Sequence, residues 1–254
     1  MIASYLLFFF NALFTFSFTK SFVSIKKQSD NPVDLSLVQD YRKRLTQDHT
    51  LIKTDMPGAG SRGNSQKTIS EIAKRSSKPE SQSIFLAKLA STIAAQNILE
   101  LGTSFGLTSA IIALYNPNAG IITIEGNQEI YQKSSDFFSL ANLHNIHSIN
   151  GLFDSEIKKI DPEIKFDLVF IDGNHTYQAS IVYFELLKER LTDTGILVFD
   201  DIYWSKGMQN AWKEIKKHRS VISSLDYFSF GLISLSQKQK PPHQKKMSKM
   251  VFSS

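Results

Sequence analysis

Two short apolar runs near the middle of the chain enclose a segment with helical spacing. Residues 166–171 and 196–199 are almost continuously apolar, and apolar residues recur at helical spacing over residues 181–191 between them. Thr194 and Gly195 are expected to end the helical segment before the second apolar run. Apolar strands joined by a helix predict a parallel pair inside a sheet that is covered on both faces.

The same alternation of elements continues on both sides of this unit. A tight turn is expected at residues 102–106, and only Asp226 and Tyr227 separate the last two strands, which should therefore pair antiparallel. The result is an α/β domain with seven strands. The other expected strands are 97–101, 121–124, 146–149, 221–225 and 228–235, and the other expected helices are 107–115, 128–141 and 206–217.

The first 82 residues are interpreted as an N-terminal extension of the domain at residues 83–236. Helices are expected at residues 35–45, with Asp34 as a plausible N-cap, and at 68–75 and 83–95, with Lys78-Pro79 between the last two. Residues 55–63 contain three glycines and a proline, which predicts a loop.

An uncharged, aromatic-rich segment occupies residues 2–18. It is near the lower limit of a membrane span and lacks the basic start and small-residue cleavage site of a secretory signal. Three interpretations stay open: a helix docked on the domain, which is slightly favoured, a segment inserted in a membrane, and, in third place, a cleaved signal. The protein is expected in the cytoplasm, and it would be associated with a membrane if the segment inserts. Assembly into a homo-oligomer also stays open as an interpretation.

Composition narrows the possible chemistry. The chain has 254 residues, no cysteine and a net charge of +5. The missing cysteines exclude disulfides, thiolate catalysis and zinc–thiolate sites. Five lysines lie in the tail at residues 237–254, which is expected to be a solvated, disordered segment. No nucleic-acid partner is therefore expected.

Acidic residues follow the two central strands. Asp172 ends the first strand, Asp200 and Asp201 end the second, and His175 stands three residues after Asp172. Ligands of such sheets bind outside the carboxyl ends of the strands. Three carboxylates and an imidazole at one sheet edge predict an active site.

The first strand of the domain leads into a second group of candidates. Gly102 and Gly106 are four residues apart, which is not the Gly-x-Gly-x-x-Gly spacing of dinucleotide folds. Glu100 precedes this turn and could attract a cationic group. Glu125, at the end of the next strand, could accept hydrogen bonds from both ribose hydroxyls, and Asp154 could meet an adenine amino group.

In the order of these residues the chain resembles class I S-adenosylmethionine-dependent methyltransferases, within them the catechol and caffeoyl-CoA O-methyltransferase-like group. The resemblance covers about residues 83–236 and implies a Rossmann-like sheet of order 3-2-1-4-5-7-6. It also implies S-adenosylmethionine as cofactor and a small-molecule acceptor. The residues that it assigns to the cofactor are Glu100, Gly102, Thr103, Ser104, Gly106, Glu125, Gly126 and Asp154.

The resemblance further implies metal-assisted O-methylation. Asp172, Asp200 and Asp201 match the metal ligands of the family, with Asp201 in place of an asparagine, and His175 replaces the catalytic lysine. Mg²⁺ or another divalent cation would hold the acceptor hydroxyl, and His175 would take its proton. A neighbouring carboxylate is expected to raise the pKa of His175.

Two other classes compete with this interpretation. One is a non-catalytic S-adenosylmethionine-binding or membrane-associated interaction protein, which measured turnover would exclude. The other is a nucleic-acid methyltransferase, which is disfavoured because no Asn/Asp-Pro-Pro-Tyr motif occurs. Tyr177, Tyr203 and Trp204 could line an aromatic acceptor pocket, although aromatic residues at strand ends more often belong to the core.

Overall fold

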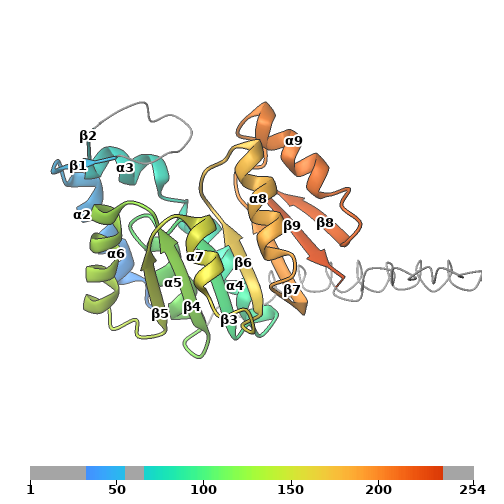
Figure 1. Cartoon of the computed structure of the whole chain (residues 1–254). Helices are drawn as coiled ribbons and strands as arrows, with labels where there is room; N and C mark the ends of the chain where they lie inside the picture. Colours follow the sequence, from blue (N-terminus) through green and yellow to red (C-terminus); the bar gives the residue numbers. More distant parts are fainter. Residues whose placement is uncertain (1–32, 55–65, 237–254) are drawn as a thin grey trace, which may run out of the picture.

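The structure is a computed structural model that describes residues 33–54 and 66–236 (Figure 1). The segment at residues 2–18, the glycine-rich loop at 55–63 and the tail at 237–254 lie outside the described residues. Their predicted roles therefore stay predictions.

A mixed sheet of seven strands forms the centre of the molecule. Its order is β5-β4-β3-β6-β7-β9-β8, which confirms the predicted order 3-2-1-4-5-7-6. The first five strands in that order are parallel, whereas β9 is antiparallel to both β7 and β8. The strands are β3 (Asn97–Leu101), β4 (Gly120–Glu125), β5 (Ile146–Asn150), β6 (Phe166–Ile171), β7 (Leu191–Phe199), β8 (Val221–Tyr227) and β9 (Phe230–Leu235).

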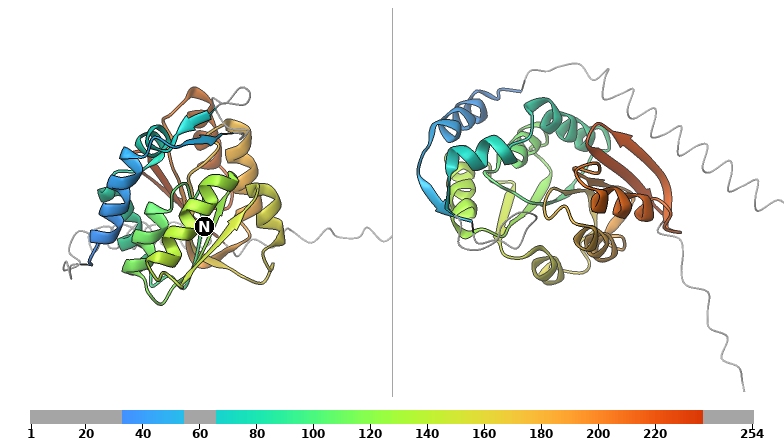
Figure 2. Two further views of the ribbon diagram at one scale, coloured as in Figure 1. Left: turned by 90° about the vertical axis from the view of Figure 1, so that its left-hand side faces the viewer. Right: turned by 90° about the horizontal axis from the view of Figure 1, so that it is seen from above.

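Helices cover both faces of this sheet, as the right-hand view of Figure 2 shows. Buried residues of α2 to α6 form one apolar cluster with one face, and buried residues of α7 to α9 form a second cluster with the other. The three-layer α/β arrangement predicted from the apolar strands is thus present. The helices are α2 (Ser36–Gln47), α3 (Ile69–Ser76), α4 (Glu80–Thr92), α5 (Leu107–Tyr115), α6 (Gln128–Leu140), α7 (Phe153–Lys159), α8 (Tyr177–Leu187) and α9 (Lys206–Ile215).

The N-terminal helices belong to the same core as the sheet. The Tyr41 ring of α2 stacks on Phe137 of α6 with ring centroids 3.9 Å apart, and its hydroxyl donates to the Lys133 carbonyl over 3.2 Å. Helix α3 begins with a capping box between Thr68 and Glu71. Residue 83, the expected start of the domain, lies inside α4. The extension is therefore packed on the domain along its described length.

Three local predictions differ from the structure. Thr194 and Gly195 do not separate the helix from the strand but lie inside β7. A Cβ at Gly195 would stand 2.8 Å from the Phe166 carbonyl oxygen, so only glycine permits this close approach to β6. The turn between β8 and β9 lies at residues 228–229, two residues later than expected. The N-cap of α2 is Leu35, while Asp34 accepts the Ser36 amide over 2.9 Å.

Three short elements escaped the sequence analysis. Helix α7 has only 7 residues, and β1 (Leu51–Lys53) and β2 (Gln66–Thr68) form a hairpin of 3-residue strands. Elements this short carry too few residues for a periodic pattern. Figure 1 shows the hairpin and α3 at one end of the large sheet.

Among the described residues, no helix combines the length and the apolar character needed to cross a bilayer. That finding does not extend to residues 2–18.

The Trp212 ring of α9 lies directly on β9, and we predict that Gly231→Ala destabilises the fold there. A Cβ at Gly231 would stand 2.6 Å from Cζ2 of Trp212. The resulting overpacking should lower the free energy of unfolding by about 1–3 kcal/mol in urea titrations. The control is Gly120→Ala, whose Cβ would meet nothing closer than the Gln96 carbonyl oxygen at 3.8 Å. Equal stabilities of the two variants would contradict this account of the packing.

Candidate active site

Backbone hydrogen bonds align the carboxyl ends of three neighbouring strands. The Asp172 amide donates to the Leu101 carbonyl over 2.8 Å, and the Asp200 amide donates to the Ile171 carbonyl over 2.9 Å. These bonds place the first residues after β3, β6 and β7 side by side. The predicted meeting of the two strand-end acids at one sheet edge is confirmed.

An imidazole lies beside these acids. Ligand atoms of Asp172, His175 and Asp200 all fall within 4.8 Å of one another. Nε2 of His175 is 3.6 Å from Oδ1 of Asp172 and 3.8 Å from Oδ2 of Asp201. Asp201 has a φ of 52°. Its side chain is 36% exposed and lies outside this group, so its predicted role as a metal ligand stays a prediction.

Lys78 pairs with both strand-end acids, which the sequence analysis did not foresee. Its Nζ forms ion pairs with Asp172, at 3.0 Å, and with Asp200. The Lys78 side chain is 8% exposed, and Nζ lies over the rings of Phe170 and Phe230 at 5.5 and 5.7 Å. Lys78 lies between α3 and α4, and no sequence pattern relates it to Asp200, which is 122 residues away.

The two carboxylates determine the charge on this lysine. Burial alone would lower the pKa of Lys78, but the charges of Asp172 and Asp200 outweigh it and raise the pKa. Burial raises the pKa of Asp172, and Lys78 opposes that rise. Ser229 donates to the remaining oxygen of Asp200 over 3.1 Å. The centre of the site is thus an ammonium ion held by two carboxylates.

The pKa of His175 differs from the prediction. Burial lowers the pKa of the imidazole, and the opposing effects of Asp200 and Asp201 do not reverse this shift. The expected rise neglected burial, since the His175 side chain is only 19% exposed. The ring is therefore neutral at physiological pH.

The divalent cation implied by the resemblance would need these residues as its ligands. The two carboxylates are suitable ligands for a hard cation, whereas the imidazole suits softer divalent ions. However, one oxygen of each carboxylate already binds the Lys78 ammonium. A divalent cation at the same oxygens would repel this ammonium at short range. As arranged, the residues fit the lysine and do not fit a metal beside it.

The predicted cofactor turn lies next to the ion pair. A Cβ at Gly102 would stand 2.0 Å from the Asp172 carbonyl oxygen, and the φ of Gly102 is 105°, so both space and backbone demand glycine. The Ser104 amide donates to Glu125 over 2.8 Å, and the Thr103 and Thr123 hydroxyls are 2.6 Å apart. The turn is therefore fixed to both β4 and β6.

Glu100 lies in β3, just before this turn, and is buried. Its side chain accepts hydrogen bonds from Ser109 and, over 2.7 Å, from Thr123, and the residue is 1% exposed. The cofactor contact that the resemblance assigns to Glu100 stays a prediction. Burial also raises the pKa of Glu100 to about 7.

The other predicted cofactor residues lie around the end of β4. Glu125 is 9% exposed and also accepts the Asn127 amide over 2.9 Å. Gly126 follows it and is half-buried, whereas Asp154 is exposed in the first turn of α7. The cofactor contacts of these residues stay predictions.

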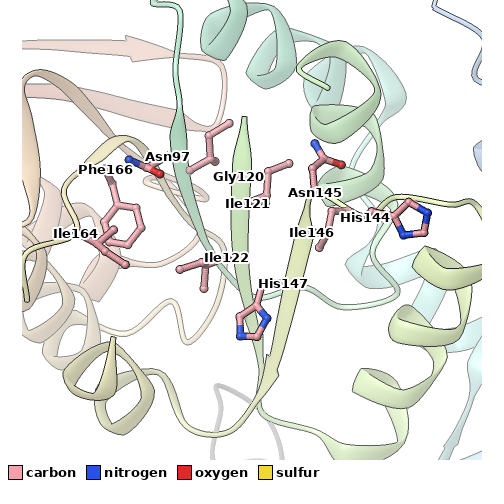
Figure 3. A pocket seen from close by; sticks show the side chains of 11 residues that line it. Asn97, Gly120, Ile121, Ile122, His144, Asn145, Ile146, His147, Ile164 and Phe166 are labelled. Atoms are coloured by element: carbon pink, nitrogen blue, oxygen red, sulfur yellow. The ribbon is translucent and has the colours of Figure 1, made fainter. Parts of the chain in front are cut away.

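An open cavity of about 230 Å³ lies at the opposite edge of the sheet (Figure 3). It is lined by the starts of β3, β4 and β5, with His144 and His147 at its side. None of the predicted site residues lines it.

The buried carboxyl of Glu100 predicts a pH-dependent difference from its amide variant. A pKa raised from 4.5 to about 7 means that protonation stabilises the folded state below pH 4.5 and that this stability is lost as the pH rises to 7. Glu100→Gln removes the loss. Relative to the variant, the protein should lose roughly 2 kcal/mol of unfolding free energy between pH 5.5 and 8. Urea titrations at both pH values measure it, and a constant difference would refute the shift.

Known proteins resemble the chain in both sequence and fold. Residues 99–202 match the family described as "Methyltransferase domain". The "Tapetum-specific methyltransferase 1" of Arabidopsis thaliana is 29% identical over 147 residues, 55% of this chain and 61% of the relative. The "Putative caffeoyl-CoA O-methyltransferase" of the same plant is 28% identical over 131 residues, 50% of this chain and 55% of the relative. The chain thus matches less than two thirds of either relative.

The fold occurs in solved methyltransferases. The O-methyltransferase from Bacillus cereus in complex with SAH superposes with a TM-score of 0.60 at 18% identity, over 85% of this chain and 96% of that one. The family match covers both strand-end acids, His175 and the cofactor turn. The chain thus contains a segment that matches a methyltransferase domain, and it has the fold of solved methyltransferases.

Proposed function

We propose that this protein transfers the methyl group of S-adenosylmethionine to a hydroxyl group of a small molecule. The observation that carries the proposal is the position of His175 within the matched domain. Its neutral imidazole lies between two carboxylates at the sheet edge that also bears the glycine turn. A base and a cofactor turn at one edge are what an O-methyltransferase requires.

The cofactor is proposed to lie over the turn after β3. Gly102 and Gly106 have positive φ values, which shape a turn that other backbones can approach closely. Glu125 offers a carboxylate at the end of β4 for the ribose hydroxyls. The other proposed contacts are Thr103, Ser104, Gly126 and Asp154, whereas Glu100 supports the turn from below.

S-adenosylmethionine supplies a sulfonium methyl group, to which the acceptor oxygen bonds as the carbon–sulfur bond breaks. His175 takes the hydroxyl proton at Nε2. The distances from Nε2 to the two carboxylates exceed a direct hydrogen bond, so this atom can accept a proton from a hydroxyl placed beside it. Asp172 and Asp201 then stabilise the imidazolium that forms.

The divalent cation implied by the resemblance has no step in this mechanism. Its carboxylates would be Asp172 and Asp200, and both are paired with Lys78. Removal of the proton by His175 and alignment of the two substrates supply the rate enhancement that we propose.

Exposed aromatic side chains support an acceptor with an apolar ring. Tyr203 and Trp204 follow Asp201 and are 54% and 60% exposed, and Phe228 on the β8–β9 turn is 72% exposed. The Ile202 amide donates to the Ser229 carbonyl over 3.1 Å, which joins the two segments. Exposed aromatic residues beside a catalytic edge favour stacking with a flat acceptor.

Glu125→Ala should weaken the binding of S-adenosylhomocysteine by about ten-fold, because charged hydrogen bonds to the ribose are lost. Isothermal titration calorimetry measures the affinity. The control is Asp136→Ala, which removes an exposed carboxylate from α6. An unchanged affinity of the Glu125 variant would exclude this residue from the cofactor site.

His175→Ala should lower kcat by roughly 10²–10⁴-fold, the usual contribution of a positioned base, while leaving the affinity for S-adenosylhomocysteine unchanged. Transfer of a labelled methyl group to a hydroxylated aromatic acceptor measures kcat. The matched control is His147→Ala, an exposed histidine beside the cavity at the opposite sheet edge. If the His175 variant turned over at the normal rate, another group would have to be the base.

A further inference from the structure

Lys78 occupies the position between Asp172 and Asp200 that a bound metal would need. Its ammonium binds Oδ2 of both carboxylates. All three side chains are largely buried, with exposed fractions of 8%, 18% and 2%. The pair is thus shielded from water and from screening by salt.

We propose that Lys78 is a built-in cation that replaces the divalent metal at this site, so that methyl transfer proceeds without a metal. The inference rests on the proposed methyltransferase function and specifies its chemistry. In this arrangement Asp172 and Asp200 hold the lysine, and Lys78 acts as a positioning residue because nothing places it in contact with the acceptor.

The surrounding chain fixes the lysine in this position. The Arg42 side chain donates to the Lys78 carbonyl over 2.9 Å, and Pro79 follows as the N-cap of α4. Two residues before Lys78, the Ser76 hydroxyl is 2.9 Å from the Ser104 hydroxyl of the predicted cofactor turn. Displacement of Lys78 by a metal would break two ion pairs and leave a charged side chain unpaired beside the Phe170 and Phe230 rings.

The same geometry predicts what the site becomes without the lysine. A neutral residue at position 78 leaves Asp172 and Asp200 unpaired beside His175, with ligand atoms within 4.8 Å of one another. Two carboxylates and an imidazole are ligands that Mn²⁺ accepts. Removal of Lys78 should therefore create a metal site that the natural chain lacks.

The test is a calorimetric titration with Mn²⁺ alone of the natural protein and of Lys78→Gln. The variant should bind Mn²⁺ at least about ten-fold more tightly than the natural protein. Mn²⁺ should also raise the melting temperature of the variant, because an ion that binds only the folded state stabilises it. Lys74→Gln, which removes an exposed lysine from α3, should behave like the natural protein.

Two further variants identify which residues give the added Mn²⁺ affinity, and a refolding experiment covers the case in which Lys78→Gln does not fold alone. Lys78→Gln/Asp200→Asn should lose the added Mn²⁺ affinity, because one of the two unpaired carboxylates is gone. Lys78→Arg keeps the positive charge and should bind Mn²⁺ no better than the natural protein. If Lys78→Gln does not fold without Mn²⁺, refolding in its presence supports the proposal, whereas failure to refold with Mn²⁺ contradicts it.

The contrary result is tight Mn²⁺ binding by the natural protein that Asp200→Asn abolishes, since Lys78 would then yield its place to the ion. Equal, weak binding by the natural protein and Lys78→Gln would also overturn the proposal. These titrations need no turnover, so they decide the role of Lys78 independently. Failure of the proposed function would instead appear as absence of methyl transfer both in EDTA and with added Mn²⁺.

Discussion

The buried pairing of Lys78 with Asp172 and Asp200 is the interaction on which the organisation of this site depends. Each of these charges would be costly in the protein interior alone, and removal of one partner from such a pair typically costs 3–5 kcal/mol. The pairing joins the segment between α3 and α4 to the ends of β6 and β7. The N-terminal helices are thereby tied to the sheet edge that carries the strand-end acids as well as to the apolar core.

The cofactor turn depends on the same edge of the sheet. Gly102 lies against the Asp172 backbone, and the Ser104 amide binds Glu125, so the turn bridges β6 and β4. Beneath it, the Glu100 carboxyl is held by Ser109 and Thr123. A change in the position of Asp172 would therefore be transmitted to the turn that we propose to hold S-adenosylmethionine.

The fold could be predicted from the sequence because β6 and the second half of β7 are short, mostly apolar runs on either side of a segment with helical spacing, and the strand-end acids directly follow these runs. The ion pair could not, because Lys78 and Asp200 are 122 residues apart and no local spacing relates them. The predicted rise of the His175 pKa was wrong for a related reason. Neighbouring charges can be read from spacing, whereas the burial that dominates this shift comes from packing.

The central claim is that Lys78 provides the positive charge at this site. Its most direct test is a crystal structure of the protein grown with S-adenosylhomocysteine and Mn²⁺, with an anomalous difference map recorded at the manganese edge. The account predicts no manganese peak between Asp172 and Asp200, with Nζ of Lys78 placed between the two carboxylates. A manganese ion bound to both carboxylates, with the lysine displaced, would contradict it.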